Sequence, residues 1–202
     1  MLKARAAVLV SGGGTNLQAI IDAQNSGLIS HGEVALVISN KADAYALTRA
    51  EQAGIPSRVI TKKQYGEAFE SAMLAALSEA RIDLIVLAGF LSILSPAFIE
   101  RYRDRILNVH PSLIPAFCGK GYYGLKVHEE ALRYGVKVTG ATVHLVNEVP
   151  DGGRILYQKA VPVRKNDTPE ILQQRVMRQA EWILLPKAVE TVSKAIVEGK
   201  DF

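Results

Sequence analysis

Asn108 and His110 are two polar residues inside an apolar stretch, Ile-Leu-Asn-Val-His-Pro, that spans residues 106–111. Residues two apart on an extended backbone point to the same face, so the amide and the imidazole should project side by side. Pro111 has no backbone N–H, which predicts that the strand ends directly after His110. Because open α/β sheets bind ligands at the carboxyl ends of their strands, the pair suggests chemistry on a carbonyl group.

Asp151 lies in a Pro-Asp-Gly-Gly turn at residues 150–153, and we expect its carboxylate to partner His110. A nearby carboxylate favours the imidazolium form, which raises the pKa of the histidine and fixes the orientation of its ring. Glycines at positions 152 and 153 would allow the close backbone approach that a reacting ligand needs. An aspartate that only caps its own turn is the alternative interpretation.

A glycine-rich segment, Ser-Gly-Gly-Gly-Thr-Asn, occupies residues 11–16 between an apolar run and a helical pattern. Its backbone N–H groups, with the side chains of Thr15 and Asn16, could hold an oxyanion at the start of a helix. No Gly-Lys-Ser/Thr follows, which excludes a Walker loop, and Leu17 replaces the third glycine of a dinucleotide-binding fingerprint. We interpret the segment as a monophosphate site, with a plain tight turn as the alternative.

The other histidines and the single cysteine give weaker signals. His144 is typical of a satisfied, half-buried histidine, whereas His31 and His128 fit a loop and a helix surface. The spacing of the four histidines predicts no metal site. Cys118 is the only cysteine, which excludes an internal disulfide. A lone thiol, no signal peptide and no apolar run of about 18 residues together predict a cytoplasmic protein.

The charge is mildly basic, with a formal net charge of +4 and a pI near 9.2. The sequence has no run of five lysines or arginines and no interleaving of aromatic and basic residues, so we predict no nucleic-acid surface. A solvated basic face and a site for small anions remain the two interpretations.

Strand and helix patterns alternate through the first half of the sequence. Apolar runs that fit strands occupy residues 6–10, 33–39, 57–60, 83–87 and 105–110. Helical patterns occupy residues 15–25, 43–53, 65–80 and 96–102. Strands that are apolar on both faces and separated by helices predict a mostly parallel α/β sheet with helices on both sides.

The second half begins with a glycine-rich loop at residues 114–125 and a helix at 126–135. Residues 138–146 and 154–163 then predict an antiparallel strand pair at the end of the sheet. A long final helix should begin with Thr168 as its N-cap and Pro169 as its first residue. Pro186 should kink or split this helix before residues 188–196.

These motifs together resemble the formyltransferases that use 10-formyltetrahydrofolate, most closely those that act on glycinamide ribonucleotide in purine biosynthesis. The similarity covers about residues 7–189 and is sharpest at residues 11–18, 39–44, 87–96, 107–115 and 145–155. It implies a Rossmann-like formyltransferase fold in one domain over residues 1–202. The half up to about residue 105 would hold the nucleotide phosphate, and the half from about residue 106 the folate and the catalytic groups.

The resemblance also implies roles for individual residues. Asn108, His110 and Asp151 correspond to the catalytic trio of the family. The residues that would bind glycinamide ribonucleotide are Gly14, Thr15, Asn16 and Glu181. The residues that would bind the folate are Leu91, Ser92, Ile93, Leu94 and Asn108. An arginine that holds the folate in some members falls at Gly66, so Lys62 or Lys63 is the expected substitute.

The implied reaction transfers the formyl group of 10-formyltetrahydrofolate, a co-substrate, to the amine of glycinamide ribonucleotide without a metal. The implied partners are these small molecules, with no nucleic acid and no membrane, and the protein would be a monomer or a homodimer. A formyltetrahydrofolate hydrolase and a methionyl-tRNA formyltransferase are the related alternatives. They would usually carry an N-terminal regulatory or a C-terminal RNA-binding domain, which we do not expect here. A nucleotide-binding module without turnover is the non-enzymatic alternative.

Overall fold

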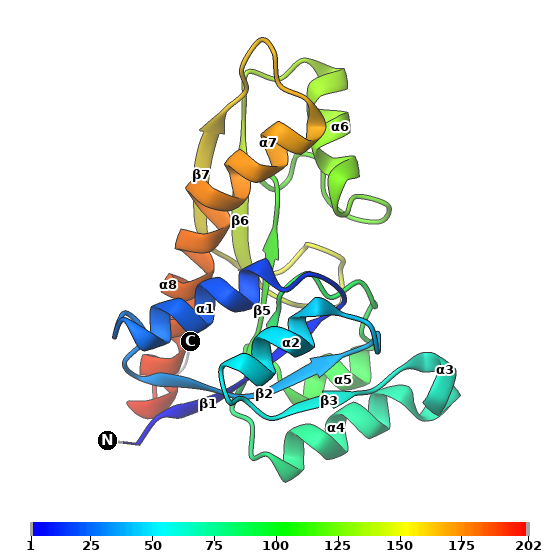
Figure 1. Cartoon of the computed structure of the whole chain (residues 1–202), viewed down its shortest axis with the longest axis vertical. Helices are drawn as coiled ribbons and strands as arrows, with labels where there is room; N and C mark the ends of the chain where they lie inside the picture. The colour runs from blue at the N-terminus through cyan, green and yellow to red at the C-terminus, as the bar shows by residue number, and fades with distance from the viewer. Residues whose placement is uncertain (1, 201–202) are drawn as a thin grey trace.

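Seven strands form one sheet in the order β3-β2-β1-β4-β5-β6-β7 (Figure 1). This computed structural model describes residues 2–200. The strands are β1 (Ala4–Val10), β2 (Gly32–Ser39), β3 (Ser57–Val59), β4 (Leu84–Leu87), β5 (Ile106–His110), β6 (Val138–Leu145) and β7 (Ile155–Pro162). The pairs among β1 to β5 are parallel, and β6 and β7 add as antiparallel neighbours. The predicted mostly parallel sheet with an antiparallel C-terminal pair is therefore confirmed.

Helices cover both faces of the sheet. They are α1 (Thr15–Asn25), α2 (Tyr45–Gln52), α3 (Lys62–Tyr65), α4 (Phe69–Glu79), α5 (Pro96–Arg101), α6 (Leu125–Tyr134), α7 (Pro169–Val176) and α8 (Trp182–Val197). One core joins a sheet face to α1, α2 and α8, with Leu17 and Leu185 fully buried. A second core joins the opposite face to α4 and α5, through Met73 and Phe98. Side chains alternate between the two faces of a strand, so strands covered on both sides must be apolar throughout.

The strand order reverses between β1 and β4. Such a reversal leaves a crevice at the carboxyl ends of the strands, because the connecting loops leave in opposite directions. The loop after β1 holds the glycine-rich segment, and the loop after β4 holds Leu91–Leu94. The amide N–H of Leu91 donates a hydrogen bond to Oγ of buried Ser11 at 3.0 Å. The two loops that the sequence singled out therefore touch.

The helix predicted over residues 65–80 is divided. The short helix α3 begins after Thr61, whose side chain caps it by accepting from the Gln64 N–H at 3.1 Å. Gly66 then adopts a φ of 55°, which ends α3. A 3₁₀ turn leads into α4, which begins at Phe69. The sequence pattern missed the division because only α4 carries the apolar spacing of a buried helix, whereas α3 is polar and has no buried residue.

The final helical region begins as predicted, with Thr168 accepting from the Ile171 N–H and Pro169 in the first position. The predicted split at Pro186 is wrong, because α8 continues through it. Pro186 is the fifth residue of α8, so its missing N–H removes one backbone hydrogen bond near the start of that helix. The irregular segment lies earlier, in a π-helical turn at Met177–Glu181.

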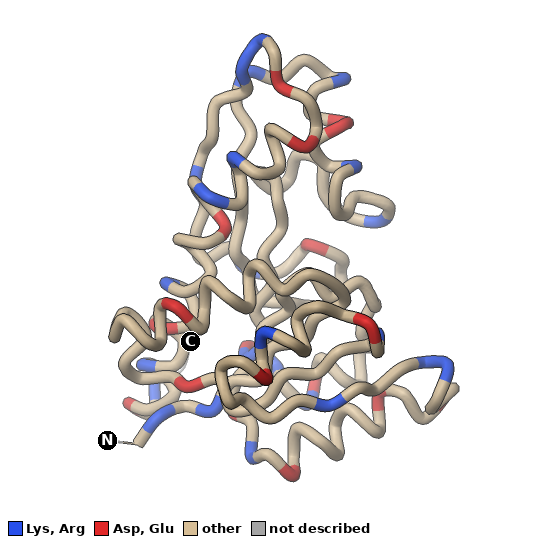
Figure 2. Tube along the Cα trace, viewed as in Figure 1, with Lys and Arg blue, Asp and Glu red and all other residues tan. Residues whose placement is uncertain are grey.

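Figure 1 shows the paired strands β6 and β7 extending with α6 and α7 beyond the rest of the sheet. Basic and acidic residues are interspersed along the whole trace (Figure 2). Within residues 2–200, no helix combines the length and the apolar character needed to cross a membrane.

Candidate active site

Asn108, His110 and Asp151 come together at the carboxyl end of β5. The Nδ1 atom of His110 lies 3.6 Å from Oδ2 of Asp151. The Nδ2 atom of Asn108 lies 3.4 Å from Oδ1 of the same carboxylate. His110 is 4 % exposed, and Asn108 is half-buried. The spacing within β5 places the first two side chains on one face, and the turn after β6 carries the carboxylate to them.

His144 joins this group, although its sequence suggested only a satisfied, half-buried residue. The antiparallel register of β5 and β6 pairs Asn108 with His144, and the Asn108 Nδ2 lies 3.1 Å from the His144 Nε2. The His144 Nδ1 lies 2.9 Å from the Leu145 carbonyl oxygen, which can only accept. When the ring is neutral, its proton is therefore on Nδ1 and Nε2 accepts from Asn108, whereas a protonated Nε2 would face the Asp151 Oδ1, 3.6 Å away. Only the pairing of the two strands reveals this contact.

His110 is held between two acceptors. Its Nε2–H donates to the Phe117 carbonyl at 2.8 Å, and its Nδ1 faces Asp151. Burial lowers the pKa of His110 below its ordinary value of 6.5, and the Asp151 charge and the Phe117 carbonyl only partly offset the desolvation. The carboxylate raises the pKa as expected, but burial outweighs this effect.

Asp151 adopts a left-handed backbone conformation, with a φ of 56°, which asparagine and aspartate tolerate better than most residues. Its Oδ2 accepts the Gly119 N–H at 2.8 Å, so it does not merely cap its own turn. Burial raises the pKa of Asp151, but the contacts with His144 and His110 and the Gly119 N–H outweigh burial and lower it overall. Asp151 is therefore an ionised carboxylate that ties the loop around Gly119 to the catalytic group.

The glycines after Asp151 allow close contacts within the protein. A Cβ on Gly152 would lie 2.6 Å from the Val149 Cβ, and a Cβ on Gly153 would overlap the Leu145 carbonyl oxygen. Gly152 thus makes room for the Val149 side chain, and Gly153 makes room for the Leu145 backbone. This close approach lets the Leu145 N–H donate to the Arg154 carbonyl at 2.9 Å, which closes the turn.

A pocket of about 710 Å³ opens over the catalytic group. Its walls include the four predicted folate-binding residues, Leu91, Ser92, Ile93 and Leu94, and the predicted nucleotide-binding residues Asn16 and Glu181. Further apolar lining comes from Phe90, Ile99 and Val146. An apolar wall with a few convergent polar groups fits a flat ring such as a pterin. Lys62 and Lys63, expected near the folate, are not among the described residues that line it.

Glu181 and Asn16 form a buried pair in this pocket. The Asn16 Nδ2 donates to the Glu181 Oε2 at 2.7 Å, while the Asn16 Oδ1 is buried without a partner in the described residues. Burial raises the pKa of Glu181 to about 7, opposed by the hydrogen bond from Asn16.

Glu181 ends the π-helical turn, and Gln173, Met177 and Glu181 all line the pocket. Four α-helical residues exceed a full turn by about 40°, whereas four π-helical residues fall short of one. The two departures offset each other and keep the three side chains on one side.

The glycine-rich loop is shaped by packing as well as by any ligand. Gly14 has a φ of 70°, and a Cβ there would lie 2.6 Å from the Ala46 Cβ on α2. Nothing lies within 4 Å of a Cβ built on Gly12 or Gly13. No described side chain caps the N-terminus of α1, so its first N–H groups stay open to an anion. Thr15 does not line the catalytic pocket.

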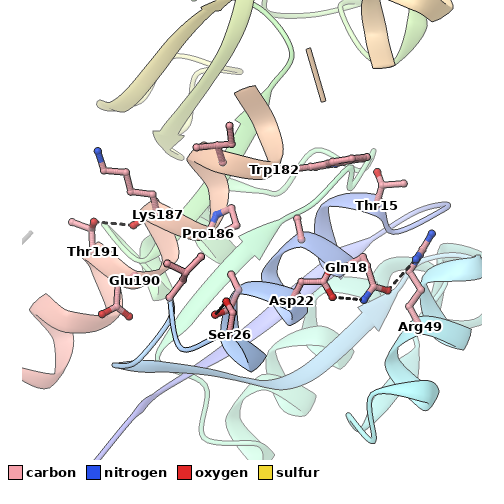
Figure 3. A pocket seen from close by; sticks show the side chains of 14 residues that line it. Thr15, Gln18, Asp22, Ser26, Arg49, Trp182, Pro186, Lys187, Glu190 and Thr191 are labelled. Carbon is pink, nitrogen blue, oxygen red and sulfur yellow. Dashed lines mark hydrogen bonds between the residues drawn. The ribbon is translucent and has the colours of Figure 1, made fainter. Parts of the chain in front are cut away.

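Thr15 instead borders a groove of about 800 Å³ between α1 and α8. Figure 3 shows the Arg49, Gln18 and Asp22 side chains at one end, joined in a chain of hydrogen bonds. The carboxylate of Glu190, which also lines the groove, binds His31 at 2.6 Å. The groove contains none of the catalytic candidates.

His128 lies at the catalytic pocket and is fully buried, so its predicted position on a helix surface is wrong. Burial and the nearby His110 lower the pKa of His128 to about 4. Neither ring nitrogen has a hydrogen-bond partner among the described residues. Within residues 2–200, no cluster of three or more His, Cys, Asp or Glu side chains is arranged to hold a metal ion.

Comparisons with known proteins place this arrangement in a family. A sequence model described as formyl transferase matches residues 4–189. A phosphoribosylglycinamide formyltransferase of Haemophilus influenzae is 44% identical over 197 residues, which cover 96% of this chain and 90% of that protein. The human trifunctional purine biosynthetic protein adenosine-3 is 46% identical over 198 residues, but this chain spans only 19% of its length.

Solved structures agree with the sequence relatives. The glycinamide ribonucleotide transformylase 1 of Symbiobacterium toebii superimposes with a TM-score of 0.89 at 41% identity, covering 96% of this chain and 89% of that one. The phosphoribosylglycinamide formyltransferase of Brucella melitensis gives a TM-score of 0.85 at 43% identity, covering 95% and 96%. The family match, the sequence identity over nearly the whole chain and the shared fold show that the chain belongs to the formyl transferase family, among the phosphoribosylglycinamide formyltransferases.

Proposed function

We propose that this protein transfers the formyl group of 10-formyltetrahydrofolate to the amine of glycinamide ribonucleotide, in de novo purine biosynthesis. The products are formylglycinamide ribonucleotide and tetrahydrofolate. The observation that carries the proposal is the convergence of Asn108, His110 and Asp151 in one pocket, between an open helix N-terminus and an apolar wall. The relatives named as phosphoribosylglycinamide formyltransferases support it.

The substrates occupy opposite sides of the pocket in this proposal. The phosphate of the acceptor lies at the N-terminus of α1, where backbone N–H groups attract anions. Asn16 and Glu181 contact the rest of the acceptor, and the unpaired Oδ1 of Asn16 gains a donor. The pterin of the donor lies against residues 91–94 and the loop at 149–151.

Asn108 stabilises the oxyanion. The acceptor amine attacks the formyl carbon, and the carbonyl electron pair moves onto oxygen. One hydrogen of the Asn108 amide leaves its long, 3.4 Å contact with Asp151 and donates to that oxygen, while the other stays on His144. Such a donor is aimed at charge that develops in the transition state, where it lowers the barrier most.

His110 moves the proton. Because burial lowers its pKa, its ring is neutral near pH 7. When the Phe117 carbonyl moves aside, the neutral ring exchanges its Nε2 proton with water and adopts the tautomer with the proton on Nδ1, facing Asp151. The Nε2 atom is then free to accept the proton that the attacking amine loses. It returns this proton to N10 of the folate as the bond from carbon to N10 breaks. Asp151 stabilises the imidazolium that exists between the two transfers.

The test uses the purified protein with 10-formyltetrahydrofolate, in the presence and absence of glycinamide ribonucleotide, and follows the release of tetrahydrofolate. We expect release only with the ribonucleotide. Release without it would identify a hydrolase, and no release in either case would leave a binding module. We also propose that the protein acts in the cytoplasm on these small molecules, as a monomer or a homodimer.

A second comparison tests the acceptor side. Asn16→Ala should raise the KM for the ribonucleotide, because Asn16 lines the pocket. Thr15→Ala is the matched control within the same loop, since the Thr15 side chain borders the groove between α1 and α8. Equal effects of the two substitutions would contradict this placement of the acceptor.

A further inference from the structure

Lys120 is the only lysine or arginine among the described residues that line the catalytic pocket. Its side chain is exposed, and no described residue forms a hydrogen bond or an ion pair with it. The pocket otherwise carries three carboxyl groups: Asp151, Glu148, which is paired with Arg103 at 2.6 Å, and Glu181, whose pKa of about 7 leaves it partly ionised near neutral pH. Both substrates of the proposed reaction are anions, and an acidic pocket repels anions unless a positive group lies close by. Lys120 is the residue positioned to supply it.

The backbone next to Lys120 is tied to the catalytic group. The N–H of Gly119 donates to Asp151 Oδ2 at 2.8 Å. The carbonyl of Phe117 accepts from His110 Nε2 at 2.8 Å. These two bonds hold the loop against the catalytic residues just before Lys120. The ammonium group is therefore presented from the edge of the reaction site rather than from a distant surface.

Glycines on both sides give Lys120 its position. Gly119 and Gly121 have φ values of 86° and 93°, a backbone region that side chains strongly disfavour. The chain therefore turns on each side of the lysine and places it at the tip of the loop. Lys126, in the first turn of α6, points back toward Gly121 but does not line the pocket.

We propose that Lys120 binds an anionic group of a substrate in the catalytic pocket and helps to select substrates that carry one. The group is either the phosphate of the acceptor or a carboxylate of the donor's glutamate tail. The inference rests on the proposed function, which supplies the two substrates. It adds an electrostatic contact that none of the catalytic residues provides.

The experiment measures steady-state formyl transfer by the full-length protein and its Lys120→Ala variant, with each substrate varied in turn. We expect the KM for one substrate to rise about tenfold, as for loss of one charge-assisted hydrogen bond. The kcat should change less than about twofold, because Lys120 touches no reacting atom. Lys120→Arg should restore most of the KM, and Lys120→Glu should raise it further.

Two controls separate charge from loop structure. Lys126→Ala removes a neighbouring lysine outside the pocket and should leave both KM values unchanged. The KM of Lys120→Ala divided by that of the wild type should decrease when the salt concentration is raised from about 20 mM to about 200 mM, because added ions screen an exposed charge. A merely structural role would give a ratio that does not depend on salt.

A donor analogue without the glutamate tail distinguishes the two sources of the anion. If Lys120 binds the tail, the effect of Lys120→Ala disappears with this donor. If Lys120 binds the phosphate, Lys120→Ala still raises the KM for the ribonucleotide when this donor is used. Unchanged KM values for both natural substrates would overturn the inference. Absence of turnover by the wild-type protein would instead overturn the proposed function.

Discussion

The Asn108 amide nitrogen lies 3.1 Å from the His144 Nε2, across the antiparallel pair of β5 and β6. His144 is almost fully buried, and its other nitrogen is fixed on the Leu145 carbonyl. The ring therefore cannot rotate or exchange its proton freely. One Asn108 hydrogen is held on His144, which leaves the other to turn toward a substrate.

A double-mutant cycle tests this relationship. Asn108→Ala should lower kcat by about 10²–10³, the usual loss for one oxyanion donor. His144→Ala should lower kcat by about tenfold, because Asn108 then loses its fixed orientation. The double variant should be no slower than Asn108→Ala alone, since His144 acts through the amide. Steady-state kinetics on variants with unchanged Tm provides the measurement. Strictly additive effects would show that His144 acts by another route.

The pH dependence of kcat/KM reports the protonation state of His110. A neutral base predicts that kcat/KM rises with pH to a plateau, with the midpoint of the rise below pH 6.5, because burial lowers the pKa of His110. Asp151→Asn should shift this rise to lower pH, because the carboxylate raises the same pKa. It should also lower kcat. If activity falls as pH rises through this range, His110 acts in its protonated form and the proton-transfer scheme is wrong.

Glu181 should make stability depend on pH. Burial raises its pKa from 4.5 to about 7, so the unfolded chain ionises at a lower pH than the folded protein. Below pH 4.5 Glu181 is neutral in both the folded and the unfolded protein, and the fold has its full stability. As pH rises toward 7, the unfolded chain ionises before the folded protein does, so this stability is lost. The free energy of unfolding should fall by about 3 kcal/mol in total, because each unit of pKa shift corresponds to about 1.4 kcal/mol.

The matched variant is Glu181→Gln, which keeps an acceptor for Asn16 and cannot ionise. Urea unfolding at pH 4 and pH 8 should show that the free energy of unfolding of the wild type falls by about 3 kcal/mol more than that of the variant. Parallel pH dependences would mean that Glu181 already ionises in the folded protein near its ordinary pKa.

Ser11→Ala should loosen the donor loop. The Ser11 hydroxyl accepts the Leu91 N–H at 3.0 Å, and Asn40 Nδ2 donates to Ser92 Oγ at 3.0 Å beside it. Loss of the first bond leaves a partly buried N–H unpaired, which costs about 1–3 kcal/mol. We expect the KM for the donor to rise more than the KM for the acceptor. Ser193→Ala is the control, because Ser193 is also buried but has no partner among the described residues. A larger KM effect from the control would contradict the role of Ser11.

Gly14 and Gly13 should respond differently to alanine. Gly14→Ala requires a side chain at a φ of 70° and within 2.6 Å of Ala46. We expect it to lower the free energy of unfolding by about 2 kcal/mol or more. Gly13→Ala meets no atom within 4 Å and should leave stability nearly unchanged. Thermal unfolding of both variants checks this, and equal Tm values would show that α2 can move away from Gly14.

The sequence predicted the architecture because local chemistry determined it. Apolar runs alternating with helical patterns required a covered parallel sheet, and Thr168 and Pro169 marked the start of the final helix. Pro111 ended the strand after His110, and the two-residue spacing placed Asn108 and His110 on one face. The division near Gly66 and the continuous helix through Pro186 were missed. In both places the outcome depends on whether side-chain packing outweighs the loss of a backbone hydrogen bond, and packing is not visible in the local sequence.

By itself, the sequence determined which residue types stand at the strand ends, since alternation along a strand and the missing N–H of proline are local properties. The tertiary structure decided what those residues touch. The register of β5 and β6 brought His144 to Asn108, and the fold of the later loop brought the Phe117 carbonyl to His110. Burial by distant segments then set the pKa of His110 and of Glu181. These properties arise from contacts between residues far apart in the chain, because desolvation and hydrogen bonding depend on three-dimensional neighbours.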